Sequence, residues 1–186
     1  VINSFSSQLN VEAVIDYSQK AEHGIFLEGT GSIIFDHSNK SAYACISPRT
    51  DVKLLNQLCA EIVYRSITFE SVDLNGGQIY HTNVMLSIAD KFAVVCLESI
   101  PDLLERSLLK KSLENSGKEV IEISYQQMNG FAANALEVNA EDGQRYYCLS
   151  KTAFDILNAD QINKIENYSK IIDFAIPTIE RVGGGT

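Results

Sequence analysis

The feature that most constrains this fold is an internal repeat with a period close to 50 residues. Polar residues that each precede an apolar stretch recur every 53 positions, at Glu28, His81 and Asn134. Cysteines recur at nearly the same spacing inside the second apolar stretch of each repeat: Cys45, Cys96 and Cys148. A period of this length, with strands and a helix in each unit, is typical of a propeller-like or solenoid array.

Each repeat is predicted to be a β-β-α-β unit, because two short apolar stretches flank a polar turn and an amphipathic helix follows them. The units cover about residues 26–70, 79–124 and 131–176 of a single domain, 1–186. The predicted strands are 26–35, 42–46, 66–70, 81–88, 92–97, 119–124, 134–139, 145–149 and 171–176. The predicted helices begin near 47–51 and span 101–115 and 152–168, and a further weak strand is expected over 11–17.

Composition excludes several classes of protein. The chain has 186 residues, 45% of them hydrophobic, with three prolines, which is typical of a globular domain. A net charge of −9 without a basic stripe argues against nucleic acid as a partner. No apolar stretch approaches the roughly 20 residues that a membrane helix needs, and the first residues do not resemble a secretion signal.

The four cysteines, Cys45, Cys59, Cys96 and Cys148, show no metal-ligand spacing. They lie in apolar surroundings, so we expect reduced, mostly buried thiols in a cytoplasmic protein, with a disulfide framework as the minor alternative. We expect neither a metal nor another cofactor.

The candidate site combines Glu28 and His81, which occupy equivalent positions in successive units. Equivalent positions of a circular array converge on its axis, and histidine takes and gives protons near neutral pH. Asn83 is expected on the same strand face as His81. Gly29, Gly31 and the run Gly183, Gly184 and Gly185 leave room for a ligand. The alternatives are a structural histidine, a solvated carboxylate and a glycine run left by a tag.

Five segments then carry a resemblance to a known family: residues 26–32, 44–51, 79–85, 117–124 and 178–185. Together they resemble the arginine deiminase-related, amidinotransferase-like family, most closely its citrulline-utilisation hydrolases. The resemblance implies a pentein-type α/β propeller of five β-β-α-β units, of which this chain covers a part. It also implies action on a guanidino or ureido amino acid, and it leaves open whether the protein is a hydrolase or a transferase, and whether it is a homodimer.

The resemblance further implies a covalent cysteine mechanism in which His81 is the acid–base group and Glu28 orients the substrate. The family's nucleophilic cysteine follows the glycine run, so the nucleophile is expected beyond Thr186. An acidic substrate-binding motif of the family's first unit is also expected outside this sequence. Asn83 replaces the aspartate of arginine deiminases, which favours neutral citrulline over arginine. A non-catalytic pentein binding module and an inactive fragment are the competing hypotheses.

Overall fold

Each unit of the repeat forms a three-stranded sheet with the same topology. In the computed structural model, which describes residue 11 and residues 13–183, the sheets have the orders β1-β2-β3, β4-β5-β6 and β7-β8-β9. The first two strands of each sheet are antiparallel, and the third strand runs parallel to the second. A hairpin makes the first connection, and a parallel pair needs a crossover, which a helix provides.

The elements of the three units follow one another in chain order. The first unit has α2 Gly29–Ser32, β1 Ile34–Asp36, β2 Ser41–Cys45, α3 Val52–Ile62 and β3 Arg65–Phe69, preceded by the 3-10 helix η1 Ser18–His23. The second has η2 Thr82–Val84, β4 Leu86–Ile88, β5 Phe92–Val95, η3 Leu97–Ser99, α4 Leu103–Asn115 and β6 Glu119–Glu122. The third has α5 Tyr125–Asn129, β7 Leu136–Asn139, β8 Arg145–Ser150, α6 Lys151–Ile156, α7 Ala159–Glu166 and β9 Lys170–Phe174, followed by α8 Pro177–Gly183.

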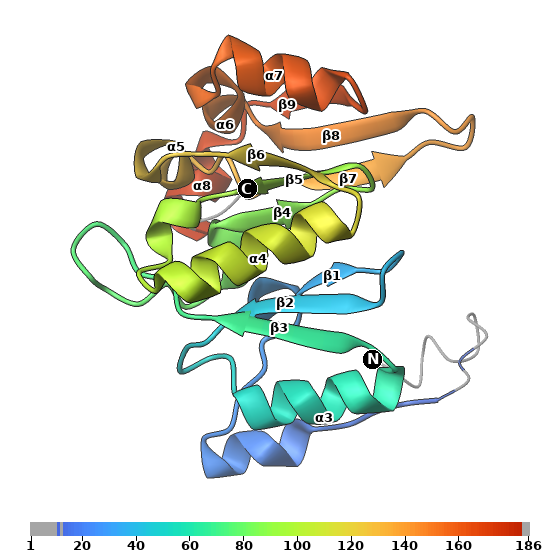
Figure 1. Ribbon diagram of the computed structural model, residues 1–186, viewed down its shortest axis with the longest axis vertical. Helices are drawn as coiled ribbons and strands as arrows, with labels where there is room; N and C mark the ends of the chain where they lie inside the picture. Colours follow the sequence, from blue (N-terminus) through green and yellow to red (C-terminus); the bar gives the residue numbers. More distant parts are fainter. Residues whose placement is uncertain (1–10, 12, 184–186) are drawn as a thin grey trace.

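The three sheets succeed one another along the long axis of the molecule (Figure 1). The first strands of the units are neighbours: β1 contacts β4, and β4 contacts β7. Helix α4 packs against β6 of its own sheet and against β3 of the preceding sheet. The units therefore share an interface rather than stacking as separate bodies.

The middle strands carry the core. Every residue of β2 and β5 is buried, as expected for strands covered on both faces. Two tyrosines lie fully inside and keep their hydroxyls bonded: Tyr43 to Ser112 at 3.1 Å, and Tyr147 to Ser87 at 2.6 Å. The main cluster of buried side chains draws on all three units, so their hydrophobic cores are continuous.

A buried ion pair joins the first sheet to the second. Lys118 Nζ lies 3.1 Å from Asp36 Oδ2, and both side chains are only 1% exposed. The ammonium also donates to the carbonyls of Ala89 and Asp90, at 3.0 and 3.2 Å. Asn39 donates to the carboxylate through its backbone and side-chain nitrogens. Such bonds are what a buried charge requires in a dry interior.

The repeat is present, but the predicted strands 26–35 and 81–88 are wrong in their first halves. Residues Gly29–Ser32 form a helical turn, which Gly29 permits with a φ of 50°. Residues Thr82–Val84 form a 3-10 turn, so His81 and Asn83 are not alternate residues of one strand. In both units the first strand starts later, at Ile34 and at Leu86.

Two helices also differ from the prediction. The predicted helix 152–168 breaks after Ile156, because Asn158 and Gln161 form a capping box that starts α7. In α4 the sequence pattern predicts Leu103, Leu104, Leu108 and Leu113 on the apolar side, but the first three are more than half exposed. Leu113 is buried as predicted, together with Leu109. No strand is found over 11–17, of which residue 12 lies outside the described part.

Replacing Lys118 by methionine should destabilise the protein by about 3–5 kcal/mol, because Asp36 is left as an unpaired buried charge. Urea unfolding gives the free energy. Lys110→Met is the matched control, since Lys110 pairs with Glu122 on the surface with 42% and 51% of the side chains exposed. That change should cost at most about 1 kcal/mol. Equal losses in the two variants would contradict a special role for the buried pair.

Candidate active site

Glu28 is positioned by a tight turn at the start of the first unit. Its backbone N–H approaches the Arg49 carbonyl at 3.3 Å and the Ser32 hydroxyl at 3.1 Å. The Ser32 hydroxyl donates in turn to the Arg49 carbonyl at 2.9 Å. Glu28 precedes α2, and Leu27 forms a bridge with Thr50. The carboxylate is thereby held beside the segment that carries Arg49.

His81 is the N-cap of η2 and reaches the site from the second unit. One face of its ring lies over Gly31, where an added Cβ would be 3.1 Å from ring atoms. The Tyr80 ring is 4.7 Å from the imidazole, edge to face. A larger residue at position 31 would displace the ring, so Gly31 is needed for the observed position of His81.

The two candidates meet directly, although 53 residues separate them. His81 Nε2 lies 2.7 Å from Glu28 Oε2, within hydrogen-bonding distance. Arg49 Nη1 approaches the same oxygen at 3.4 Å, and its guanidinium lies over the Tyr80 ring at 4.6 Å. The hydrogen bond from His81 is the main cause that lowers the pKa of Glu28 below its ordinary 4.5, and Arg49 adds to it. The carboxylate is therefore ionised at neutral pH, and the imidazole N–H donates to it.

A cavity of about 330 Å³ opens beside this pair. Its described lining includes Arg49, His81, Asn83, Asn129 and Asn134, and Gly183 reaches it from α8. No carboxylate is among these lining residues. The cavity thus presents one cation, one imidazole and several amides.

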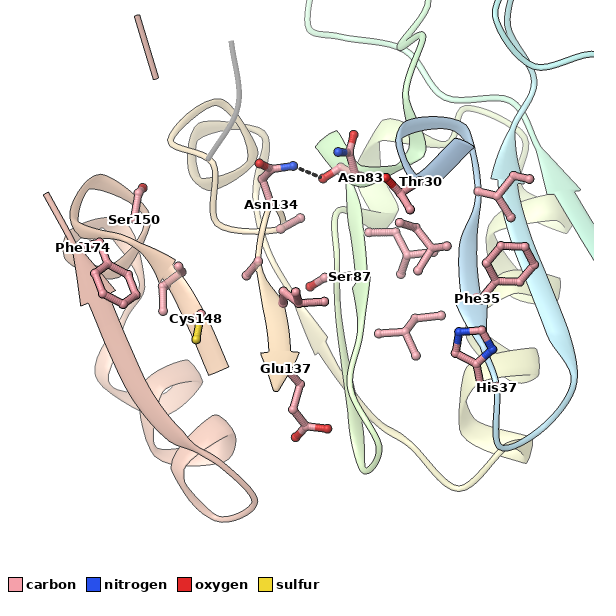
Figure 2. A pocket seen from close by; sticks show the side chains of 18 of the residues that line it. Thr30, Phe35, His37, Asn83, Ser87, Asn134, Glu137, Cys148, Ser150 and Phe174 are labelled. Carbon is pink, nitrogen blue, oxygen red and sulfur yellow. Dashed lines mark hydrogen bonds between the residues drawn. The ribbon is translucent and has the colours of Figure 1, made fainter. Parts of the chain in front are cut away.

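A second cavity of about 610 Å³ lies between the first strands of the units. Figure 2 shows Asn134 and Asn83 at one end of it, and the Asn134 amide donates to the Asn83 carbonyl at 3.1 Å. His37 and Glu137 lie at the other end in the same view. Because Asn83 and Asn134 line both cavities, they form the border between them.

The sequence candidates divide into three groups. Glu28 and His81 are brought into contact, and Asn83 reaches the same cavity from η2. Gly184 and Gly185 lie outside the described residues. Sequence reasoning missed Arg49 and Tyr80 as neighbours of the pair, although both belong to the segments that carried the resemblance. It placed Gly31 at the site as room for a ligand, whereas the His81 ring lies over this glycine.

None of the four cysteines has the surroundings of an activated thiol. Burial raises the pKa of Cys45, Cys59 and Cys148, and it raises that of Cys96 to about 11. A nucleophilic cysteine needs the opposite shift, toward the thiolate.

The described residues contain no group of three or more histidines, cysteines, aspartates or glutamates that could hold a metal ion. Among those same residues, no helix has the length and apolarity that crossing a membrane requires.

Comparison with known proteins finds one family model that covers the whole chain. Residues 1–186 match the family model described as N,N dimethylarginine dimethylhydrolase, eukaryotic. No curated protein matches the chain in sequence.

Solved structures share the fold at low sequence identity. ArgZ, an arginine dihydrolase from the ornithine-ammonia cycle in cyanobacteria, matches with a TM-score of 0.66 at 14% identity, over 86% of this chain and 23% of that chain. Its N-terminal domain bound to substrate matches with a TM-score of 0.63 at 14% identity, over 84% of this chain and 53% of that chain. A variant of AgrE with L-arginine gives 0.65 at 14% identity, over 84% and 22%.

These matches confirm the predicted pentein-type α/β fold and the predicted relationship to guanidine-modifying enzymes. The chain spans about half the length of the arginine dihydrolase domain that it matches.

The Glu28–His81 hydrogen bond predicts a pH dependence. Since the folded-state pKa of Glu28 lies below its ordinary 4.5, the bond contributes stability above that value, and this is lost as pH falls through the folded pKa. In His81→Ala, the titration midpoint of the Glu28 carboxyl should rise toward the ordinary value. Carboxyl carbon NMR measures it, with Glu22, an exposed glutamate of η1, as an internal reference. An unchanged Glu28 midpoint would show that the bond does not form in solution.

Proposed function

The chain belongs to the eukaryotic N,N-dimethylarginine dimethylhydrolase family, and from this premise we propose that it supplies the acid–base groups of a hydrolase acting on a guanidino or ureido amino acid. One observation carries the proposal: the 2.7 Å contact between Glu28 and His81 beside a cavity of amino-acid size. An imidazole fixed by a carboxylate is a common arrangement for moving protons to and from a reacting nitrogen.

His81 is the general acid and then the general base in this proposal. A thiolate adds to the central guanidino or ureido carbon, and the C–N bond breaks as the leaving amine takes a proton from His81. His81 then removes a proton from water, the water oxygen bonds to the same carbon, and the C–S bond breaks. Glu28 holds the imidazole through its Oε2, which Arg49 also approaches.

The thiolate itself comes from outside residues 1–186 in this proposal. The support is chemical: burial raises the pKa of each of the four thiols present, which disfavours nucleophilic attack at neutral pH.

Citrulline is the preferred substrate in this proposal. The described lining beside His81 offers amides and a guanidinium, which suit a neutral ureido group and an amino-acid carboxylate. A cationic guanidinium group would find no free carboxylate among these residues. Dimethylarginine is the second candidate, and the family match is the observation that favours it. A cytoplasmic location is proposed with it, since the four thiols are free.

Turnover of citrulline, dimethylarginine and arginine by the full-length protein tests the substrate. Citrulline should react at least tenfold faster than either guanidino compound, measured as kcat/KM from ornithine, dimethylamine or ammonia released. Faster turnover of dimethylarginine would replace the citrulline assignment by the second candidate. Absence of turnover with all three would contradict the proposed function itself.

His81→Ala in the full-length protein should lower kcat by about 10²–10⁴-fold, the range expected on removing a general acid–base group. The fold should persist, with a stability change of at most about 1–2 kcal/mol, because the ring contributes little to the core. His23→Ala is the matched control, since His23 is exposed in η1 and should leave both quantities unchanged. Global unfolding of His81→Ala would favour a structural histidine.

A further inference from the structure

We propose that Thr82 is a positioning residue, whose buried hydroxyl sets the placement of His81 against Glu28. The expected effect of Thr82 on turnover rests on the proposed function, whereas its expected effect on the geometry of the Glu28–His81 pair does not. Thr82 directly follows His81 in the chain and is the first residue of η2.

The Thr82 hydroxyl is fully buried and uses both of its hydrogen-bonding capacities. It accepts a hydrogen bond from the backbone N–H of Cys45 at 2.8 Å, at the end of β2. It donates to the carbonyl of Ser32 at 2.6 Å, at the end of α2. The hydroxyl therefore binds η2 of the second unit to two elements of the first unit.

Ser32 completes the connection on the Glu28 side. While its carbonyl accepts from Thr82, its own hydroxyl accepts from the Glu28 N–H at 3.1 Å and donates to the Arg49 carbonyl. Ser32 is fully buried as well. Ser32 thus links the segment of His81 to the backbone of Glu28, because its carbonyl accepts from Thr82 and its hydroxyl accepts from Glu28.

The solvent exposure of the Glu28–His81 bond and of the Thr82 bonds indicates which of them fixes the position of the His81 ring. The Glu28 and His81 side chains are 39% and 23% exposed, so water competes for their hydrogen bond. The Thr82 bonds lie in the dry interior, where breaking them leaves polar groups unpaired. We therefore assign the placement of the imidazole over Gly31 and against Glu28 mainly to Thr82.

Thr82→Val tests this, because valine keeps the shape of threonine and removes the hydroxyl. The nuclear Overhauser contact between the His81 ring and the Gly31 α-protons should weaken at least twofold, and the Glu28 titration midpoint should rise. In the full-length protein kcat should fall about 10–100-fold with KM within about threefold, as for a small misplacement of a reacting group. Thr82→Ser, which keeps the hydroxyl, should restore all three quantities.

Ser71→Ala is the matched control. Ser71 is fully buried between β3 and η2 and bonds to Ser99 of η3 at 2.8 Å, so its loss should lower stability without altering the His81–Gly31 contact. If Thr82→Val does not fold, Thr82→Ala takes its place, since the smaller side chain leaves room for water at the two polar groups. A folded hydroxyl-free variant that keeps the contact and the Glu28 midpoint would overturn the proposal. So would a serine variant that loses them. Both readouts stand even if the wild-type protein turns over none of the amino acids.

Discussion

The buried pair between Lys118 and Asp36 is the interaction on which the arrangement of the first two units depends. It joins the end of β1 to the residue before β6, and each charge is surrounded by further hydrogen bonds. The candidate site lies across the same two units, with the carboxylate from one and the imidazole from the other. The position of the carboxylate relative to the imidazole therefore depends on how the first two units pack against each other.

Much of the fold and part of the site could be predicted because the repeat is a long-range pattern. Equal spacing of Glu28 and His81 placed them at equivalent points, and the structure brings them into contact. The predictions that were wrong concern local structure. The turns at Gly29–Ser32 and Thr82–Val84 depend on hydrogen bonds between distant segments, such as that of Thr82 to Ser32, which no short-range pattern reports. Leu103 and Leu108 fit a helical stripe, but the sheet covers a different side of α4.

The charge around the cavity supports the proposed preference for a neutral ureido group more directly than the total charge does. A net charge of −9 suggests an affinity for cations, yet the described lining beside His81 has no carboxylate, and Glu28 is engaged by His81 and Arg49. Pairing with His81 and Arg49 offsets the negative charge of Glu28. The acidic groups of the surface act at longer range and are screened by salt.

The Glu28–His81 contact also has a consequence for symmetry. Glu28, His81 and Asn134 each precede the first strand of their unit, so they hold the same place in three copies of one design. Identical copies would make a different contact: two carboxylates at 2.7 Å would have to share a proton, and two imidazolium groups would repel each other. A hydrogen-bonded carboxylate–imidazole pair between neighbouring units therefore requires different residue types at equivalent positions of the repeat. The repeat places the two side chains next to each other, and their different residue types allow the hydrogen bond between them.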